Sequence, residues 1–289
     1  MDYEGNVFRP PSEAASILLQ VTTGCSHNKC TFCGMYKQQK FRIKTDEEIY
    51  ADIVFAEKNC RNQRRLFLCD GDTLSIPHKR LVATLEQVRR HLPWITRVGT
   101  YANTKSIYHK SPEQLAELRH LGLQIAYMGL ESGDDTTLKE IRKGADSQRM
   151  IAMGRKIREA GIKLSVTVLL GIAGKERSPI HARETGRVLS AIDPEYVGAL
   201  SLMLVPNTPL YEQHQKKAFT LPDPMEMLEE IGIMLRHTTL TDGLFHANHA
   251  SNYLPIKAKL PEDKEATLAR IEDALKGKIG LRPEYLRAL

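Results

Sequence analysis

Residues 24–36 read Gly24-Cys25-Ser26-His27-Asn28-Lys29-Cys30-Thr31-Phe32-Cys33-Gly34-Met35-Tyr36 and hold three of the five cysteines of the chain. This loop follows an apolar, β-branched run at 17–21, which predicts a strand that ends shortly before Cys25. In parallel α/β barrels the chemistry takes place at the carboxyl ends of the strands. The stretch 17–36 therefore indicates both the fold class and the place of a functional site.

The rest of the chain alternates strand-like and helix-like segments. Apolar, β-rich runs lie at 16–21, 66–69, 95–101, 124–130, 163–170 and 196–205. Segments with helical spacing lie at 46–60, 79–91, 112–121, 136–141, 147–160 and 180–191. Strands that alternate with helices of about 10–15 residues predict βαβ units and a parallel sheet. We predict an α/β fold, an open partial (β/α)6 TIM-like barrel, because this rhythm is too short for a closed eight-stranded barrel.

The rhythm changes after Pro206. We expect a Met-rich helix at 224–237 and a charged helix at 262–276, with a polar segment at 244–253 between them. The predicted organisation is an N-terminal extension at 1–12, a core barrel at 13–215 and a C-terminal cap at 216–289. The last part is too short to bury a core of its own.

The composition favours a cytoplasmic enzyme. Of the 289 residues 42% are hydrophobic and 26% are charged, which is ordinary for a globular protein. The first residues do not resemble a signal peptide, and no apolar run approaches the roughly 20 residues of a membrane span. Five cysteines with three clustered fit a reducing compartment better than a disulfide framework. The formal charge of +6 is spread along the chain, so we do not expect a nucleic-acid partner.

The clustered thiols are candidate metal ligands. Fe–S clusters are normally held by four cysteine thiolates, so a loop with three leaves one iron of a four-iron cluster open to a small molecule. The alternative is a structural zinc site that adds an in-loop histidine, although such sites usually join ligands from separate segments. Its ligands would be Cys25, Cys30, Cys33 and His27. Unligated thiols are the third interpretation.

Two cysteines lie outside this loop. Cys60 and Cys69 are too few to hold a second cluster, and we expect both to be small buried side chains. Cys69 directly precedes the turn Asp70-Gly71-Asp72-Thr73 at the end of the second predicted strand. Gly71 permits a close approach of the backbone to a ligand. An ordinary Asp-Gly turn is the alternative interpretation.

The cysteine loop resembles the cluster loop of the radical S-adenosylmethionine (SAM) superfamily. In that family three cysteines hold a [4Fe-4S] cluster, and the amino and carboxylate groups of SAM bind the fourth iron. Phe32 matches the aromatic residue that directly precedes the third cysteine. The first gap between cysteines is four residues instead of the usual three, and the second gap is the usual two. The resemblance implies a [4Fe-4S] cluster on Cys25, Cys30 and Cys33, with SAM as second cofactor and Phe32 near its adenine.

The turn at 70–73 is similar in position to the glycine-rich turn that takes the SAM ammonium in this superfamily, although it lacks the usual Gly-Gly-Glu-Pro. The resemblance assigns Gly71, Asp72 and Thr73 to SAM binding, with Asp72 as partner of the ammonium.

The segments 127–134 and 138–144 resemble the fourth-strand region of the branch that contains anaerobic coproporphyrinogen oxidases and tRNA methylthiotransferases. This assigns Glu131 and Lys143 to SAM, because a carboxylate suits ribose hydroxyls and a cation suits a carboxylate. Arg142 is the alternative to Lys143, and a helix cap is the alternative role for Glu131.

The polar segment near the C-terminus supplies candidate catalytic or substrate-binding groups, namely His246, His249 and Asn252. An internally hydrogen-bonded cap is the alternative. The family resemblance implies reductive cleavage of SAM to a 5′-deoxyadenosyl radical, which abstracts hydrogen from a small-molecule substrate, or from a peptide or protein. It also implies an electron donor such as flavodoxin or ferredoxin. The competing classes are an Fe–S electron carrier or sensor and a zinc-stabilised binding module.

Overall fold

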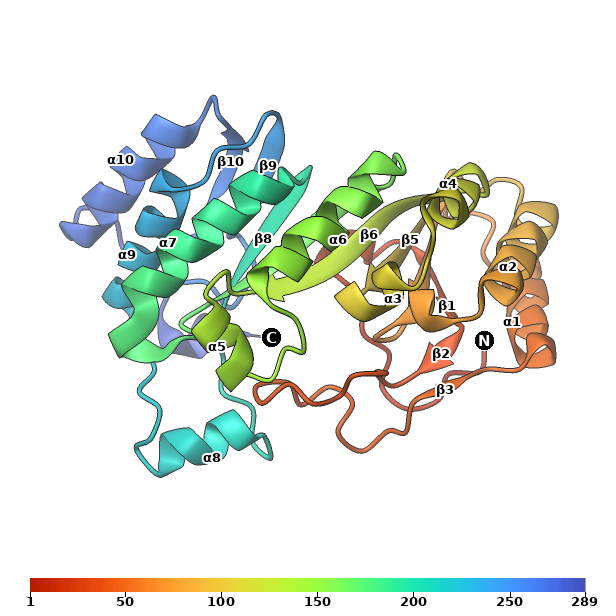
Figure 1. Ribbon diagram of the computed structural model, residues 1–289, viewed down its shortest axis with the longest axis horizontal. Coiled ribbons are helices and arrows are strands. Elements are labelled where there is room, and N and C mark those ends of the chain that lie inside the picture. Colours follow the sequence, from red (N-terminus) through yellow and green to blue (C-terminus); the bar gives the residue numbers. More distant parts are fainter. Residues whose placement is uncertain (289) are drawn as a thin grey trace. The chain divides into compact units, whose positions relative to one another are not determined.

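The computed structural model describes residues 1–288, which form an α/β fold (Figure 1). The hydrogen-bonded strand order of the main sheet is β1-β4-β5-β6-β7-β8-β9-β10. The described residues divide into two compact units. Unit 1 comprises Met1–Asn28, Met35–Met128 and Lys156–Leu164, and unit 2 comprises Lys29–Gly34, Gly129–Arg155 and the chain from Ser165 onward.

Unit 1 is built on parallel strands. β1 (Ile17–Gln20), β4 (Arg65–Cys69), β5 (Arg97–Ala102) and β6 (Leu123–Glu131) pair in this order, each parallel to the next. The last residues of β6, from Gly129, belong to unit 2. Their apolar side chains, among them Leu19, Leu66 and Phe67, are fully buried. β2 (Thr22–Thr23) and β3 (Arg42–Ile43) form a separate antiparallel pair, which the apolar pattern did not predict.

The helices of unit 1 follow the strands. They are α1 (Asp46–Asn59), α2 (His78–His91), α3 (Thr104–Tyr108) and α4 (Pro112–His120), with the short 3-10 helices η1 (Pro11–Glu13) and η2 (Thr73–Ser75). Thr45 caps α1 and Ser111 caps α4, each in a reciprocal capping box, so both predicted helix starts are confirmed. α1 and α2 lie side by side (Figure 1).

The strands of unit 2 extend beyond the prediction. β7 (Lys163–Leu170), β8 (Tyr196–Ser201) and β9 (Gly243–His246) are parallel, and β10 (Lys257–Leu260) pairs with β9 in the antiparallel sense. β8 ends earlier than the predicted 196–205 segment. β9 and β10 lie where only a cap was expected, because such short strands carry little apolar signal. The predicted fold class is nevertheless confirmed.

The helices of unit 2 include both predicted C-terminal helices. They are α5 (Asp135–Glu140), α7 (Gly174–Ile192), α8 (Pro209–Gln215), α9 (Pro224–Arg236), α10 (Lys264–Leu275) and η3 (Glu284–Leu286), while α6 (Ser147–Glu159) contributes to both units. α9 packs against α7 and α10 (Figure 1). The predicted boundary near residue 215 stays a prediction. None of the helices in residues 1–288 is long and apolar enough to cross a membrane.

Candidate functional site

The cysteine loop begins directly after β1 and β2. Cys25 belongs to unit 1, whereas Cys30 and Cys33 belong to unit 2, and all three side chains are partly exposed. Phe32 is also partly exposed. Within residues 1–288, no three His, Cys, Asp or Glu side chains are gathered as a ready metal site. The spacing of the thiols and their place at the carboxyl end of the first strand make them candidate ligands, and their role as metal ligands stays a prediction.

The turn after β4 packs against the first of these cysteines. The Gly71 N–H donates a hydrogen bond to the Gly24 carbonyl at 3.0 Å. A Cβ atom at position 71 would lie 2.7 Å from the Cys25 Cβ and 3.0 Å from its Cα. Real Cβ atoms do not approach so closely, so only glycine fits this contact without a shift. The close backbone approach expected at Gly71 is thus made to the cysteine loop.

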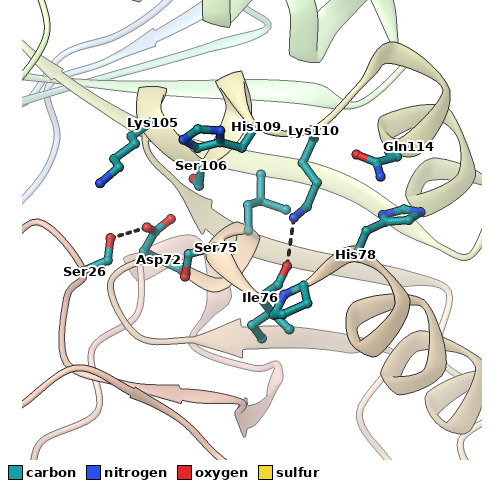
Figure 2. A pocket seen from close by; sticks show the side chains of 12 residues that line it. Ser26, Asp72, Ser75, Ile76, His78, Lys105, Ser106, His109, Lys110 and Gln114 are labelled. Carbon is teal, nitrogen blue, oxygen red and sulfur yellow. Dashed lines mark hydrogen bonds between the residues drawn. The ribbon is translucent and has the colours of Figure 1, made fainter.

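Asp72 presents a carboxylate oxygen that lacks a partner. The residue is 1% exposed, and the Ser26 hydroxyl donates to its Oδ2 (Figure 2). In the described part of the chain, its buried Oδ1 accepts no hydrogen bond. Burial raises the pKa of Asp72. The nearby side chains of Ser26, Ser106 and Asn103 partly oppose this rise, because they favour the charged carboxylate. A buried acceptor without a donor is costly, so the site suits a ligand that brings a donor such as ammonium.

The side chain of Thr73 stabilises the turn by hydrogen bonds to the end of β4. The buried Thr73 hydroxyl lies 3.3 Å from the Cys69 carbonyl and 3.4 Å from the Leu68 carbonyl, to which it donates. Its role in SAM binding stays a prediction. Cys69 is fully buried as expected, and burial raises the pKa of its thiol. The expectation for Cys60 was wrong, because this residue follows the last turn of α1 and is partly exposed.

Asp70 starts the same turn in a left-handed conformation, with φ of 73°. Gln20 Nε2 donates to its Oδ2 at 2.7 Å, and the Tyr36 hydroxyl donates to its Oδ1 at 3.3 Å. Burial raises the pKa of Asp70 to about 6. A non-glycine residue in this backbone region is strained, and its partners hold it there.

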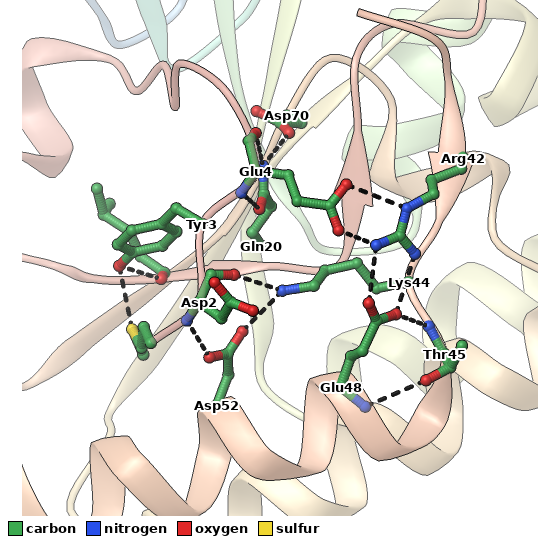
Figure 3. Close-up of polar contacts among 12 residues, drawn as sticks. Asp2, Tyr3, Glu4, Gln20, Arg42, Lys44, Thr45, Glu48, Asp52 and Asp70 are labelled. Atoms are coloured by element: carbon green, nitrogen blue, oxygen red, sulfur yellow. Dashed lines mark hydrogen bonds and ion pairs between the residues drawn. The ribbon is translucent and has the colours of Figure 1, made fainter.

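The first residues of the chain are linked to this turn (Figure 3). The Glu4 N–H donates to Gln20 Oε1 at 2.8 Å, and Gln20 Nε2 donates to the Glu4 carbonyl at 3.0 Å. Close by, Lys44 Nζ lies 3.0 Å from Asp52 Oδ2 and 2.7 Å from the Asp2 carbonyl. The Asp2 N–H donates to Asp52 Oδ1 at 2.7 Å. The buried Lys44–Asp52 ion pair is therefore completed by the N-terminal segment.

At the end of β6, Glu131 and Lys143 form an ion pair. Glu131 Oε1 lies 2.9 Å from Lys143 Nζ, and both side chains are largely buried. Glu131 has φ of 64°, which turns the chain sharply at the strand end. A Cβ at Gly129 would overlap the Glu131 carboxylate, so this glycine makes room for the pair. Arg142 is exposed, and Lys143 pairs with Glu131. Which of the two cations contacts SAM stays a prediction.

Asn252 is tied into the sheet of unit 2. Its side chain is fully buried, and Oδ1 accepts a hydrogen bond from the Ser201 hydroxyl at 2.9 Å. Its Nδ2 donates to the Ala199 carbonyl at 2.8 Å. These contacts with β8 support the alternative of an internally hydrogen-bonded cap. A catalytic role for Asn252 stays a prediction.

His246 and His249 are partly buried. Burial lowers the pKa of both, and Lys257 adds to this effect at His246 and Arg282 at His249. The Ser251 N–H donates to His249 Nδ1 at 3.1 Å, so this nitrogen carries no proton. Both imidazoles therefore favour the neutral form, and their catalytic role stays a prediction.

Unit 2 contains a buried polar cluster that the sequence did not predict. Glu230 on α9 and His181 on α7 are 0% exposed, with His181 Nε2 3.3 Å from Glu230 Oε1. Glu230 also accepts hydrogen bonds from the Gly171 N–H at 2.7 Å and from the Ser178 hydroxyl. His181 Nδ1 lies 2.8 Å from Ser132 Oγ. The cluster joins α7, α9 and the end of β6. The one feature of the sequence that could have indicated it is Glu230, a glutamate on the apolar face of the Met-rich helix.

A pocket of about 420 Å³ opens beside Asp72 in unit 1 (Figure 2). It lies between η2, the start of α2, α3 and the start of α4. Lys105, His109 and Lys110 line it, and none of them belongs to a motif of the sequence. The lysines lie outside every motif, so no local signal distinguishes them from surface cations.

Residues 19–182 match the sequence pattern of the Radical SAM superfamily. This stretch is more than half of the 289 residues and contains the cysteine loop, the turn at 70–73 and the Glu131–Lys143 pair. The chain therefore belongs to the radical SAM superfamily, which confirms the predicted family.

Curated relatives share part of the chain. The heme chaperone HemW of Bacillus subtilis is 22% identical over 191 residues, which are 66% of this chain and 49% of HemW. The hopanoid C-2 methylase of Rhodopseudomonas palustris is 25% identical over 218 residues, which are 71% of this chain and 39% of the methylase. The chain thus spans about half the length, or less, of these relatives.

Solved radical SAM structures share the fold. Coproporphyrinogen III oxidase (HemN) of Escherichia coli superposes with a TM-score of 0.56 and 17% identity, over 76% of this chain and 50% of that one. The methyltransferase TsrM of Kitasatospora setae, solved with cobalamin and a [4Fe-4S] cluster, gives a TM-score of 0.55 and 18% identity, over 70% and 40%. At these identities the likeness shows the fold alone.

Proposed function

We propose that this protein is a radical SAM enzyme in which Cys25, Cys30 and Cys33 hold a [4Fe-4S] cluster and Asp72 binds the SAM ammonium. When bound, the cluster supplies the electron that cleaves SAM to methionine and a 5′-deoxyadenosyl radical, which abstracts hydrogen from a substrate. Family membership and the three-thiol loop support the cluster.

The contact between the turn at 70–73 and the cysteine loop carries this proposal. Gly71 packs against Cys25, and the next residue, Asp72, offers a buried carboxylate oxygen that lacks a donor. The chain thereby brings an acceptor for ammonium beside the first thiol of the loop. An α-amino group has the charge and the donors to fill this position.

Glu131 and Lys143 are assigned to the remaining polar groups of SAM. The Glu131 carboxylate accepts hydrogen bonds from ribose hydroxyls, and Lys143 pairs with a carboxylate. Their mutual ion pair at 2.9 Å fixes both side chains before the ligand binds. Gly71 and Thr73 shape the turn, and Phe32 packs near the adenine.

The substrate is assigned to the class of small molecules. The pocket of about 420 Å³ beside Asp72 supports this, since ligand pockets for small molecules span roughly 300–1,000 Å³. A flavodoxin or ferredoxin supplies the electron in the cytoplasm. His246 and His249 are the candidate proton-transfer groups.

The test is anaerobic reconstitution of the full chain with iron and sulfide, followed by dithionite, SAM and chromatography for 5′-deoxyadenosine. We expect about one or more 5′-deoxyadenosine per protein from the wild type and none above background from Cys30→Ala, which lacks a ligand. Cys60→Ala is the matched control, because Cys60 lies outside the loop, and it retains wild-type activity.

Other outcomes identify the competing classes. Wild-type cleavage of SAM by Cys30→Ala contradicts the proposal. A four-iron cluster with intact SAM supports an electron carrier or sensor, and zinc without iron after anaerobic purification supports a zinc-stabilised binding module.

A further inference from the structure

The pocket beside Asp72 carries more positive charge than its one carboxylate balances. Figure 2 shows Lys105, His109 and Lys110 along one side, with Asp72 and Ile76 opposite. All of these residues belong to unit 1. They come from α3, the residues that follow it and the turn after β4, so the pocket lies at the carboxyl ends of β4 and β5.

Lys110 is the main cation of this pocket. The residue is 5% exposed, and in residues 1–288 its Nζ donates one hydrogen bond, to the Ile76 carbonyl at 2.8 Å. An ammonium group has three donors, so two stay available for a ligand. Burial lowers the pKa of Lys110, while the charge of Asp72 opposes this effect. A buried charge is costly without partners, and a bound anion would supply them.

The surrounding charges do not cancel this cation. Lys105 is exposed at the rim, and His109 adds an imidazole on the same side. His78 at the far end is already paired, because its Nε2 lies 2.6 Å from Glu117 Oε2. Its buried Nδ1 lacks a hydrogen-bond partner among the described residues. Asp72 is thus the one carboxylate among the residues that line the pocket, and it faces two lysines.

The rest of the lining is apolar or neutral. Leu74, Ile76 and Pro77 form an apolar wall, and Ser75, Ser106 and Gln114 add neutral hydrogen-bonding groups. A ligand with an acidic group and a compact apolar body fits both the cationic side and the apolar wall of the pocket. None of the residues that line the pocket is Phe, Tyr or Trp, which disfavours a stacked base.

We propose that this pocket binds an acidic group of the substrate, a carboxylate or a phosphate, through Lys110 and Lys105. The inference rests on the proposed function, in which Asp72 binds the ammonium of SAM. The substrate is thereby assigned to the class of small organic acids or phosphate esters held beside SAM.

The test measures anion binding apart from catalysis. The full chain is titrated with sodium phosphate and, separately, with sodium succinate at constant ionic strength, and the rise in Tm gives each Kd. We expect one anion to bind more tightly, which identifies the acidic group. Lys110→Met and Lys105→Met each weaken its binding about tenfold, equivalent to about 1.4 kcal/mol. Lys79→Met, an exposed lysine outside the pocket, binds as the wild type does.

A second titration separates the substrate from SAM. Cluster-loaded, unreduced protein is saturated with SAM and titrated again, and we expect the anion Kd to change by less than about twofold. Loss of anion binding under SAM overturns the inference, because the lysines would then bind the SAM carboxylate. Equal Kd values in wild type and both lysine variants also overturn it, as does an unchanged Tm with both anions. Lys105 is exposed, so its variant gives a result even if Lys110→Met does not fold.

The failure of the proposed function has a different signature. If no 5′-deoxyadenosine forms but the anion titration depends on Lys105 and Lys110, the pocket is confirmed and the enzyme class is wrong. If 5′-deoxyadenosine forms and the anion titration ignores both lysines, the enzyme class stands and the substrate assignment is wrong.

Discussion

At position 71 any side chain would reach into the cysteine loop. We predict that Gly71→Ala displaces Cys25, because the new Cβ would lie 2.7 Å from the Cys25 Cβ. Overpacking of this kind costs about 1–3 kcal/mol. The expected result is a loss of most of the iron and sulfide bound per chain after anaerobic reconstitution, measured by chemical analysis.

Gly280→Ala is the matched control for this substitution. A Cβ at position 280 meets no atom within 4 Å, so its iron and sulfide content equals that of the wild type. Equal cluster content in Gly71→Ala would show that the turn does not constrain the loop.

The candidate site residues differ in how strongly the sequence alone indicates them. Short motifs contain the three loop cysteines, Gly71 and Asp72, and the residue types and spacing of these motifs are enough to predict their chemistry. Glu230 and Lys110 depend on contacts between segments far apart in the chain, with His181 and Ile76 respectively. No local pattern encodes such a contact, so these residues became visible only with the fold.

Among the elements, α5 and α7 are joined by Asp134. Its carboxylate caps α5 by accepting from the Thr137 N–H at 3.1 Å, and Arg177 on α7 donates to the same oxygen at 2.7 Å. Burial would raise the pKa of Asp134, but the hydrogen bonds from Thr137 and Arg177 outweigh it and hold the pKa below its ordinary value. The ionised carboxylate therefore stabilises the folded state.

We predict that Asp134→Asn lowers the free energy of unfolding by about 1–3 kcal/mol at pH 7. Asparagine still caps the helix, so the loss reports the charge. A lowered carboxyl pKa gives stability that is full above the ordinary value near pH 4 and is lost as the pH falls through the folded-state pKa. The difference between the variant and the wild type therefore shrinks towards pH 3, as measured by urea unfolding at each pH. A difference that is constant with pH contradicts this assignment.

The helices and long strands were predictable because their apolar periodicity and caps are local. Thr45 and Ser111 mark helix starts by hydrogen bonds within one turn. β9 and β10 were missed, since Lys257 and Lys259 alternate with two apolar residues and so short a run is ambiguous. β9 takes its place in the sheet by pairing with β8, a long-range contact, and β10 takes its place by pairing with β9.

At the scale of the whole molecule, SAM binding and stability are linked. Under the proposed function, SAM at about 100 times its Kd raises the free energy of unfolding of the cluster-loaded protein by about 2.7 kcal/mol. For a chain of this length that corresponds to a Tm increase of about 5 °C, measured by calorimetry without reductant.

Asp72→Asn removes the charge that faces the ammonium, so we expect it to abolish most of this increase at the same SAM concentration. Asp242→Asn is the control, because Asp242 lies on the surface of unit 2 and pairs with Lys259. It keeps the wild-type increase. A full increase in Asp72→Asn would remove Asp72 from the binding site.

The link between Glu4, Gln20 and Asp70 gives the first residues an influence on the turn at 70–73. Proteolytic trimming of residues 1–4 would take both backbone partners from Gln20 and uncover the Lys44–Asp52 pair. Gln20 would then hold Asp70, the strained residue next to Gly71, with less support. A protease that removes only these first residues is therefore expected to loosen the turn at 70–73, which lies in the interior of the sequence.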